Sequence, residues 1–285
     1  MSLLDANNMA RYVTLGGERY LVDRDWIEWS EASPKGFVSQ VAVDSHGNLF
    51  LVNRGNPVIQ VFDPDGKLVR QLSSDVLSHG HGIFIARDDS VFIVDSDRHC
   101  VHKFDSGLQH VLTIGRQDYP TYGEPFNHPT DVGVSADGHI FVSDGYGNSH
   151  IHKFAPSGEH LKTWGGSGDE DGQFSNPHSI WVTHDNSILV ADRENNRVER
   201  FSLDGARLGT FCRAHHPTEI CQAASGIVYV TDLTPRISAY SPEGELLGRC
   251  RTFGAIGHGV CTDHRGDIYI ADMMPNTITR FRKIS

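Results

Sequence analysis

Long apolar segments are absent from this chain of 285 residues. No run approaches the roughly 20 apolar residues that a membrane-spanning helix needs, so we expect no membrane partner. The opening residues, MSLLDANNMARYV, lack a basic stretch followed by an apolar one, so we expect no signal peptide.

Cysteine is also scarce. The chain has five cysteines and no CxxC pair: Cys100, Cys212, Cys221, Cys250 and Cys261. An odd number without a paired motif is typical of free thiols in a reducing compartment, and a globule of this length needs no disulfides to be stable. We therefore expect a cytoplasmic protein.

Positive charge is limited. The chain carries 25 basic and 36 acidic residues, a net charge of −11, and its basic residues do not cluster. Proteins that bind a nucleic acid backbone need a basic surface, so we expect no nucleic acid partner.

The chain does contain a repeat of 40 to 49 residues. We number six repeats, 1 to 6, from a shared position zero, at Ser39, His81, Thr130, His178, Thr218 and His258. Eight residues later each repeat has a residue that tolerates a left-handed turn: Gly47, Asp89, Gly138, Asn186, Gly226 and Gly266. An aromatic residue follows 22 to 24 positions after position zero: Phe62, Phe104, Phe154, Phe201, Tyr240 and Phe281.

The apolar runs between these markers are short and rich in β-branched residues, which indicates strands rather than helices. Each repeat reads as strand, turn, strand, loop, strand, turn, strand, which is a propeller blade. We predict an all-β, six-bladed propeller that forms one domain over residues 1–285. The last repeat lacks an outer strand, and ERYLVDRDWIEW (residues 18–29) is the segment expected to supply it and close the ring. The alternative is an open solenoid, which the complementary ends disfavour.

An acidic or amide residue stands 14 positions after position zero in every repeat: Asn53, Asp95, Asp144, Asp192, Asp232 and Asp272. These side chains are either metal ligands or strand-end caps. A residue that all repeats share favours the structural role, because Asp and Asn cap turns.

Histidine occupies position zero only in alternate repeats, at His81, His178 and His258. Alternate blades of a six-fold ring lie a third of a turn apart, so three imidazoles converge on the axis. Three histidines with one open position form a catalytic zinc arrangement. The alternative is a set of hydrogen-bonded histidines beside a polar channel. His79, His128 and His216 are expected to be solvated loop residues.

Two arginines and a tyrosine, Arg54, Arg193 and Tyr146, stand 15 or 16 positions after position zero. The second strand returns to the face where position zero lies, so these side chains are expected near the metal. Cations beside a metal ion repel it unless an anion binds, which predicts a carboxylate ligand held by arginine. The same charges favour a tyrosinate, which could act as a base.

The segments PTDV…FVSDGYGNS, GQFSNPHSI and ADRENNRV resemble the lyase domain of peptidylglycine α-amidating enzymes, a six-bladed propeller of NHL-type repeats. The resemblance runs from about Val41 to Phe281 and is densest over 129–201. It implies cleavage of an α-hydroxyglycine carbinolamide into an amide and glyoxylate. Zinc would be held by the three position-zero histidines, with Tyr146 as base and Arg54 and Arg193 in the active site.

The chain departs from this family at four positions. Gly259 replaces an Asp that helps to hold a structural calcium, so calcium is doubtful, and Ile256 replaces a methionine. Gly147 and Leu189 replace two cysteines of the secreted members, so the disulfides are absent. A small or peptide-derived carboxylate substrate is therefore expected. The alternative functions are a non-catalytic NHL scaffold and a lactonase-type metal-dependent hydrolase.

Overall fold

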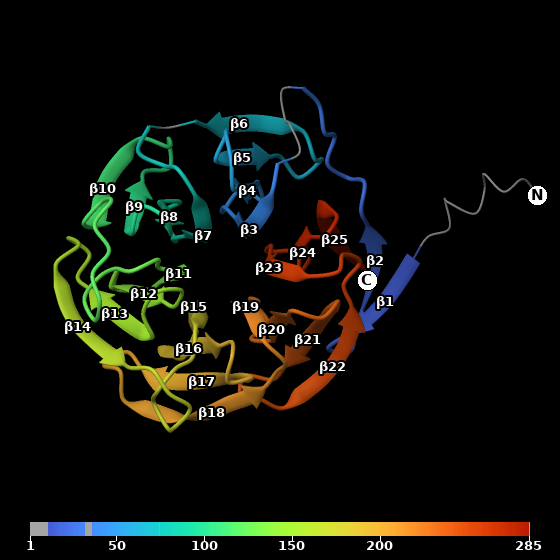
Figure 1. Ribbon diagram of the computed structural model, residues 1–285. Coiled ribbons are helices and arrows are strands. Elements are labelled where there is room, and N and C mark those ends of the chain that lie inside the picture. The colour runs from blue at the N-terminus through green and yellow to red at the C-terminus, as the bar shows by residue number, and fades with distance from the viewer. Residues whose placement is uncertain (1–10, 32–35, 74, 285) are drawn as a thin grey trace, which may run out of the picture.

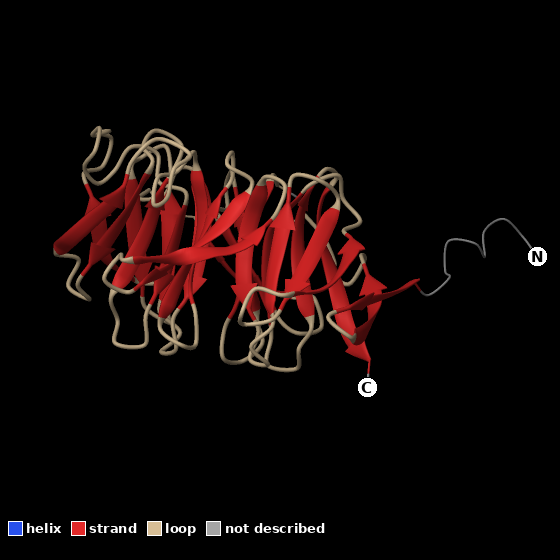
Figure 2. Cartoon of the chain, turned by 90° about the horizontal axis from the view of Figure 1, so that it is seen from below, coloured by secondary structure: helices blue, strands red, loops and turns tan. Residues whose placement is uncertain are grey.

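The computed structural model describes residues 11–31, 36–73 and 75–284. These residues form six β-sheets that stand around a central axis, each sheet being one blade (Figure 1). The fold is a six-bladed β-propeller, as the repeat predicted. Strands cross the thickness of the ring and loops gather on its two faces (Figure 2). None of the described residues belongs to a helix long and apolar enough to cross a membrane.

Each blade is antiparallel, and its first strand lies nearest the axis. The innermost strands are β3 (Val38–Val43), β7 (Gly80–Ile85), β11 (Asp131–Val134), β15 (Pro177–Val182), β19 (Pro217–Gln222) and β23 (Gly257–Thr262). The second strands are β4 (Leu49–Asn53), β8 (Val91–Asp95), β12 (Ile140–Asp144), β16 (Ser187–Asp192), β20 (Val228–Asp232) and β24 (Ile268–Met273). The third strands are β5 (Ile59–Phe62), β9 (Cys100–Phe104), β13 (His150–Phe154), β17 (Arg197–Ser202), β21 (Arg236–Tyr240) and β25 (Asn276–Ile284). The outer strands are β6 (Leu68–Leu72), β10 (His110–Gly115), β14 (His160–Gly165), β18 (Arg207–Arg213) and β22 (Leu246–Arg251).

The outer strand of the last blade comes from the N-terminal part of the chain. β2 (Glu18–Asp23) pairs antiparallel with β25, and β1 (Arg11–Leu15) pairs with β2 as a fifth strand. This pairing joins the two ends of the described chain and excludes the open solenoid. Leu15 and Tyr20 are each 1% exposed, and the Tyr20 hydroxyl lies 3.1 Å from that of Tyr229 in blade 5. Burying such side chains stabilises the closed ring by about 1.5–3 kcal/mol each.

The markers of the repeat take the conformations that their chemistry favours. All six residues at offset eight have positive φ, between 59° and 90°. Glycine, Asn and Asp reach this region at the lowest cost, so they make the tight turn between the first two strands. The six marker aromatics lie in the second halves of the third strands and are at most 3% exposed. They fill the space between adjacent blades.

The Asp or Asn that each repeat has at offset fourteen supports the structure of its blade. These side chains are at most 2% exposed. In blades 2 to 4 the carboxylate accepts the backbone N–H of the residue three positions before position zero, at Ser78, Asn127 and Ser175. The carboxylates therefore hold the loops that enter the innermost strands, which supports their structural role.

The five cysteines are free, as expected, and four of them are buried. Burial raises the pKa of the Cys100, Cys212 and Cys250 thiols to about 12. Thiols in this state are poor nucleophiles, so they act as packing residues.

Candidate metal centre

The three position-zero histidines meet at the axis. His81 lies in β7, His178 in β15 and His258 in β23, and each side chain is at most 4% exposed. One ring nitrogen of each lies within 4.8 Å of those of the other two. The ring centroids are 4.9 to 5.1 Å apart. The alternation in the sequence thus becomes a compact set of three nitrogen donors.

The intervening blades orient these imidazoles. Each Nδ1 contacts a position-zero backbone carbonyl of the next blade, at 2.7 Å from His81 to Thr130, 2.7 Å from His178 to Thr218 and 2.9 Å from His258 to Ser39. A carbonyl only accepts, so every Nδ1 carries the proton and every Nε2 is left with a lone pair. The sequence pattern did not reveal this role of the Ser and Thr positions.

The histidines are held in the neutral form. Burial, then the neighbouring histidines and arginines, lower the pKa of His81 and His178 well below the usual value. Burial and Arg54 lower the pKa of His258 to about 3. Neutral imidazole is the form that ligates a metal ion, so no proton has to be removed near pH 7.

The donor set fits a metal ion. The Tyr146 hydroxyl lies 2.7 Å from His81 Nε2 and 3.0 Å from His178 Nε2. A hydroxyl has one proton, so it can satisfy only one of these lone pairs. Three convergent lone pairs with a single donor lack the protons that a hydrogen-bonded histidine cluster needs, whereas a cation satisfies all of them.

A backbone hydrogen bond in each blade places the rim residues beside this centre. The N–H at offset 15 or 16 donates to the carbonyl two residues before position zero: Arg54 to Phe37 at 2.9 Å, Tyr146 to His128 at 3.3 Å and Arg193 to Asn176 at 3.2 Å. Because the second strand ends at the start of the first, these three side chains reach the mouth above the histidines, as the offsets predicted.

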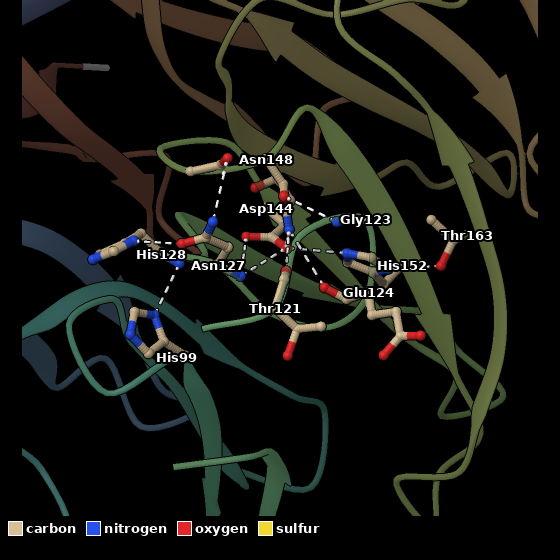
Figure 3. Close-up of polar contacts among 12 residues, drawn as sticks. His99, Thr121, Gly123, Glu124, Asn127, His128, Asp144, Asn148, His152 and Thr163 are labelled. Atoms are coloured by element: carbon tan, nitrogen blue, oxygen red, sulfur yellow. Dashed lines mark hydrogen bonds and ion pairs between the residues drawn. The ribbon is translucent and has the colours of Figure 1, made fainter. Parts of the chain in front are cut away.

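Hydrogen bonds around Asp144 hold the loop that carries Tyr146, and Figure 3 shows the residues that surround this carboxylate. The Asp144 carboxylate accepts the backbone N–H of Asn127 at 3.0 Å and the side-chain amide of Asn148 at 2.7 Å. Asn127 in turn accepts the Gly147 N–H through its carbonyl at 3.0 Å. A Cβ at Gly147 would lie 2.6 Å from that carbonyl oxygen, so the close approach requires glycine.

The arginines flank the same opening. The guanidinium carbon of Arg193 lies 5.7 Å from the Tyr146 ring centroid. Arg54 lies over Phe37, 5.4 Å from the ring centroid. Both arginines lower the pKa of His178 and His258, which places their charge close to the donor nitrogens. Such a mouth favours an anionic ligand.

Comparison with known proteins agrees with this architecture. The NHL repeat family matches residues 126–154 and 174–201. NHL repeat-containing protein 3 of Homo sapiens is 32% identical over 292 residues, which cover 92% of this chain and 84% of that protein.

The chain belongs to the NHL-repeat family.

It is also homologous to peptidyl-α-hydroxyglycine α-amidating lyase domains. The peptidyl-glycine α-amidating monooxygenase of Mus musculus is 32% identical over 299 residues, or 86% of this chain. The chain spans only 30% of the length of that relative. Peptidyl-α-hydroxyglycine α-amidating lyase 1 of Drosophila melanogaster is 29% identical over 218 residues, 64% of this chain and 40% of that protein.

Solved structures share the fold of this NHL-repeat propeller. A streptogramin B lyase has a TM-score of 0.68 at 12% identity, covering 93% of this chain and 98% of its own. A gluconolactonase of Xanthomonas campestris has a TM-score of 0.71 at 16% identity, covering 95% and 91%. At this identity the likeness concerns the fold alone.

A buried acid pair below the histidines of the NHL-repeat propeller was not anticipated. Asp131 and Glu219 directly follow position zero in blades 3 and 5, and their exposed fractions are 4% and 5%. Burial raises the pKa of Asp131 to about 7 and that of Glu219 well above the usual value. Gln40 donates to Glu219, and Ser179 donates to its other oxygen at 2.5 Å. The acidic residues one position after position zero in two repeats were the sequence feature that could have predicted this pair.

The loop histidines of the NHL-repeat propeller are partly exposed and lie outside the cluster of His81, His178 and His258, but each also has a polar partner. His79 lies 3.5 Å from Asp97, and His216 lies 3.1 Å from Glu194. The His128 Nδ1 lies 2.8 Å from the Asn127 side-chain oxygen. Each imidazole is partly covered because its residue lies two positions before position zero, where the loop folds back onto the rim.

Proposed function

We propose that this propeller is a zinc-dependent carbon–nitrogen lyase. Its substrate would be a carbinolamide, an α-hydroxyglycine-like compound with a carboxylate, and its products an amide and glyoxylate or a related aldehyde. The observation that supports this most strongly is the meeting of three neutral histidines, one tyrosine hydroxyl and two arginines at one mouth. Homology to amidating lyases supports the reaction class.

The Nε2 atoms of His81, His178 and His258 would hold the zinc ion. When bound there, zinc supplies Lewis acidity that polarises a substrate oxygen. The backbone carbonyls of the intervening blades keep each Nδ1 protonated, so the ligand nitrogens stay aimed at the axis.

Tyr146 would move the proton. Its oxygen lies within 3.0 Å of two ligand nitrogens, so it reaches a hydroxyl bound at the open side of the histidines. The phenolate oxygen takes the hydroxyl proton, the C–O bond becomes a carbonyl, and the C–N bond breaks. The departing nitrogen takes that proton back from Tyr146, so the products are a neutral amide and an aldehyde and the tyrosine oxygen is regenerated.

Arg54 and Arg193 would bind the substrate carboxylate. Among the described residues, Arg193 is paired with Glu194 only through Nε and Arg54 contacts Ser39 only through Nε, so both side chains keep terminal N–H groups, and a planar guanidinium binds a carboxylate through two parallel hydrogen bonds. This orientation sets the hydroxyl-bearing carbon toward Tyr146.

A carbinolamide assay with metal analysis tests the proposal. We expect about one zinc per chain and the release of glyoxylate from an N-acyl-α-hydroxyglycine. His178→Ala should lose both the metal and turnover while the far-ultraviolet spectrum of the strands persists. Zinc-free protein without turnover would favour the NHL scaffold, and hydrolysis of a sugar lactone instead would favour the lactonase alternative.

We further propose a cytoplasmic location, with no nucleic acid or membrane partner. The five free thiols support a reducing compartment, and the net charge of −11 disfavours an anionic polymer as ligand.

A further inference from the structure

Both rim arginines are fixed through the same atom. The Arg54 Nε–H donates to Ser39 Oγ at 3.3 Å, and the Arg193 Nε–H donates to Glu194 Oε1 at 2.8 Å. No described residue accepts a hydrogen bond from the terminal Nη atoms of either side chain. Each guanidinium is therefore held along one edge and keeps its two-nitrogen end available for a carboxylate.

Ser39 links Arg54 to the metal centre. It is fully buried, and its hydroxyl donates to the His81 carbonyl at 3.2 Å while a lone pair accepts from Arg54. Its own carbonyl accepts the Nδ1–H of His258 at 2.9 Å. One residue thus orients an arginine and a metal-binding histidine together.

Glu194 holds Arg193 in a comparable way. Its second oxygen lies 3.1 Å from His216 Nε2, so the carboxylate is gripped on both sides. The side chain of Arg193 is only 17% exposed, whereas that of Glu194 is 40% exposed. The glutamate is thus the more solvent-exposed partner, and the guanidinium that it holds lies 5.7 Å from the Tyr146 ring centroid.

We propose that Ser39 and Glu194 are positioning residues that preorganise Arg54 and Arg193 as a two-arginine clamp for the substrate carboxylate. The inference rests on the proposed function for the identity of the substrate. Fixing a long side chain before binding lowers the entropy lost on association. A planar guanidinium also makes two hydrogen bonds to a carboxylate only when the two groups are aligned. The clamp therefore binds a carboxylate more tightly than the charge of two free arginines alone accounts for.

Variants at Glu194 distinguish positioning from simple electrostatics, because the two explanations predict opposite changes in the affinity for an anion. Removing a negative charge beside Arg193 should strengthen binding of an anion if charge alone matters. If Glu194 positions the guanidinium, Glu194→Ala weakens binding. Glu194→Gln keeps the acceptor oxygen and removes the charge, so it binds the anion at least as tightly as the wild type.

The test is calorimetric titration of the full chain with glyoxylate and with its uncharged methyl ester. We expect Ser39→Ala and Glu194→Ala each to weaken glyoxylate binding by about five- to tenfold, with ester binding and zinc content unchanged. Arg54→Ala combined with Ser39→Ala should bind no more weakly than Arg54→Ala alone.

Blade 2 offers matched controls. Ser96 is a buried serine whose hydroxyl donates to the Pro129 carbonyl at 2.6 Å, and Asp97 is a rim carboxylate paired with His79. Neither residue contacts an arginine by any hydrogen bond or ion pair among the described residues. Ser96→Ala and Asp97→Ala should therefore bind glyoxylate as the wild type does.

Wild-type affinity in both Ser39→Ala and Glu194→Ala, tighter binding in Glu194→Ala, or equal losses in the controls would overturn the proposal. A wild type that binds no glyoxylate would also overturn it. If glyoxylate binds and the anchor variants weaken it, but no carbinolamide is cleaved, the clamp stands and the lyase proposal fails.

Discussion

At the residue scale, Tyr146 joins the histidines to the arginines. Its side chain is 41% exposed, yet its hydroxyl reaches two buried imidazoles. Two glycines make this possible, since a Cβ at Gly145 would collide with the Pro177 carbonyl oxygen and one at Gly147 with Asn127. The backbone of the loop is thus held by close approach, while the ring stands in the mouth where a substrate can reach it.

Replacing Tyr146 by phenylalanine keeps the ring and removes the hydroxyl. If the phenolate is the base, turnover of a carbinolamide should fall by about 10² to 10⁴. Zinc content should stay constant because the Nδ1 bonds of the histidines remain. Tyr122, which is 80% exposed, provides the control Tyr122→Phe. Normal turnover in Tyr146→Phe would remove this residue from the proton transfer.

At the element scale, β1 and β2 decide whether the ring is closed. β2 pairs with β25 over five residue pairs, from Arg19 with Ile284 to Asp23 with Arg280. Tyr20 connects this added strand to blade 5 through Tyr229, so the closure also packs against a neighbouring blade. A closed propeller leaves fewer unpaired strand edges than an open array of blades.

Tyr20→Ala should therefore weaken the closure. We expect the free energy of unfolding to fall by about 3–5 kcal/mol, since a buried aromatic ring is lost and leaves a cavity. Tyr12→Ala on β1 removes a side chain that is 50% exposed and should change the free energy by less than about 1 kcal/mol. Urea denaturation of both variants measures the difference, and equal effects would contradict the role given to Tyr20.

At the scale of the whole molecule, the axis concentrates titratable groups. Three histidines with lowered pKa lie above two carboxyl groups with raised pKa. Both the three imidazoles and the two carboxyl groups are buried, and burial disfavours the charged form of each group. The stability of the ring must therefore depend on pH, with opposite slopes from the two layers.

The acid pair predicts lower stability at alkaline pH. In the unfolded chain Asp131 and Glu219 ionise near pH 4, whereas burial raises the pKa of Asp131 to about 7 and that of Glu219 well above its usual value. The folded state then binds more protons, so the free energy of unfolding falls as pH rises, by at most about 1.4 kcal/mol per pH unit and group. The histidines act in the opposite direction, but only below about pH 6.5.

Thermal unfolding between pH 6.5 and 8 tests the acid pair, because the buried thiols, whose pKa is raised to about 12, add a slope of the same sign only at higher pH. The wild type should lose about 5 °C or more over this range, and Asp131→Asn should flatten the slope. Its amide oxygen can still accept the Ile180 N–H, which now lies 3.1 Å from the carboxylate. Asp169→Asn at the exposed surface is the control. A wild-type melting temperature that does not change over this range would contradict the shared burial of the pair.

Much of the fold and part of the site were readable from the sequence alone. The residues at offset eight act locally because they adopt the positive φ of a tight turn, and the aromatics of the third strands act locally because they are buried. Each repeat therefore predicts its own blade. The alternation of His81, His178 and His258 becomes a three-fold set because any closed ring of six blades brings the same offset to the axis. The rim positions of Arg54, Tyr146 and Arg193 follow from strand direction in the same way.

The tertiary structure alone decided which groups satisfy these side chains. Ser39 accepts from His258 across 219 residues, and Gln40 meets Glu219 across 179. No repeat contains both partners, and no offset says whether a serine hydroxyl faces an arginine or a glutamate oxygen faces a histidine. The contact between Ser39 and His258 exists because closing the ring places the first blade beside the last. Gln40 meets Glu219 of blade 5 because the innermost strands of all six blades line one axis, and burial there leaves each polar atom only the partners that other blades supply.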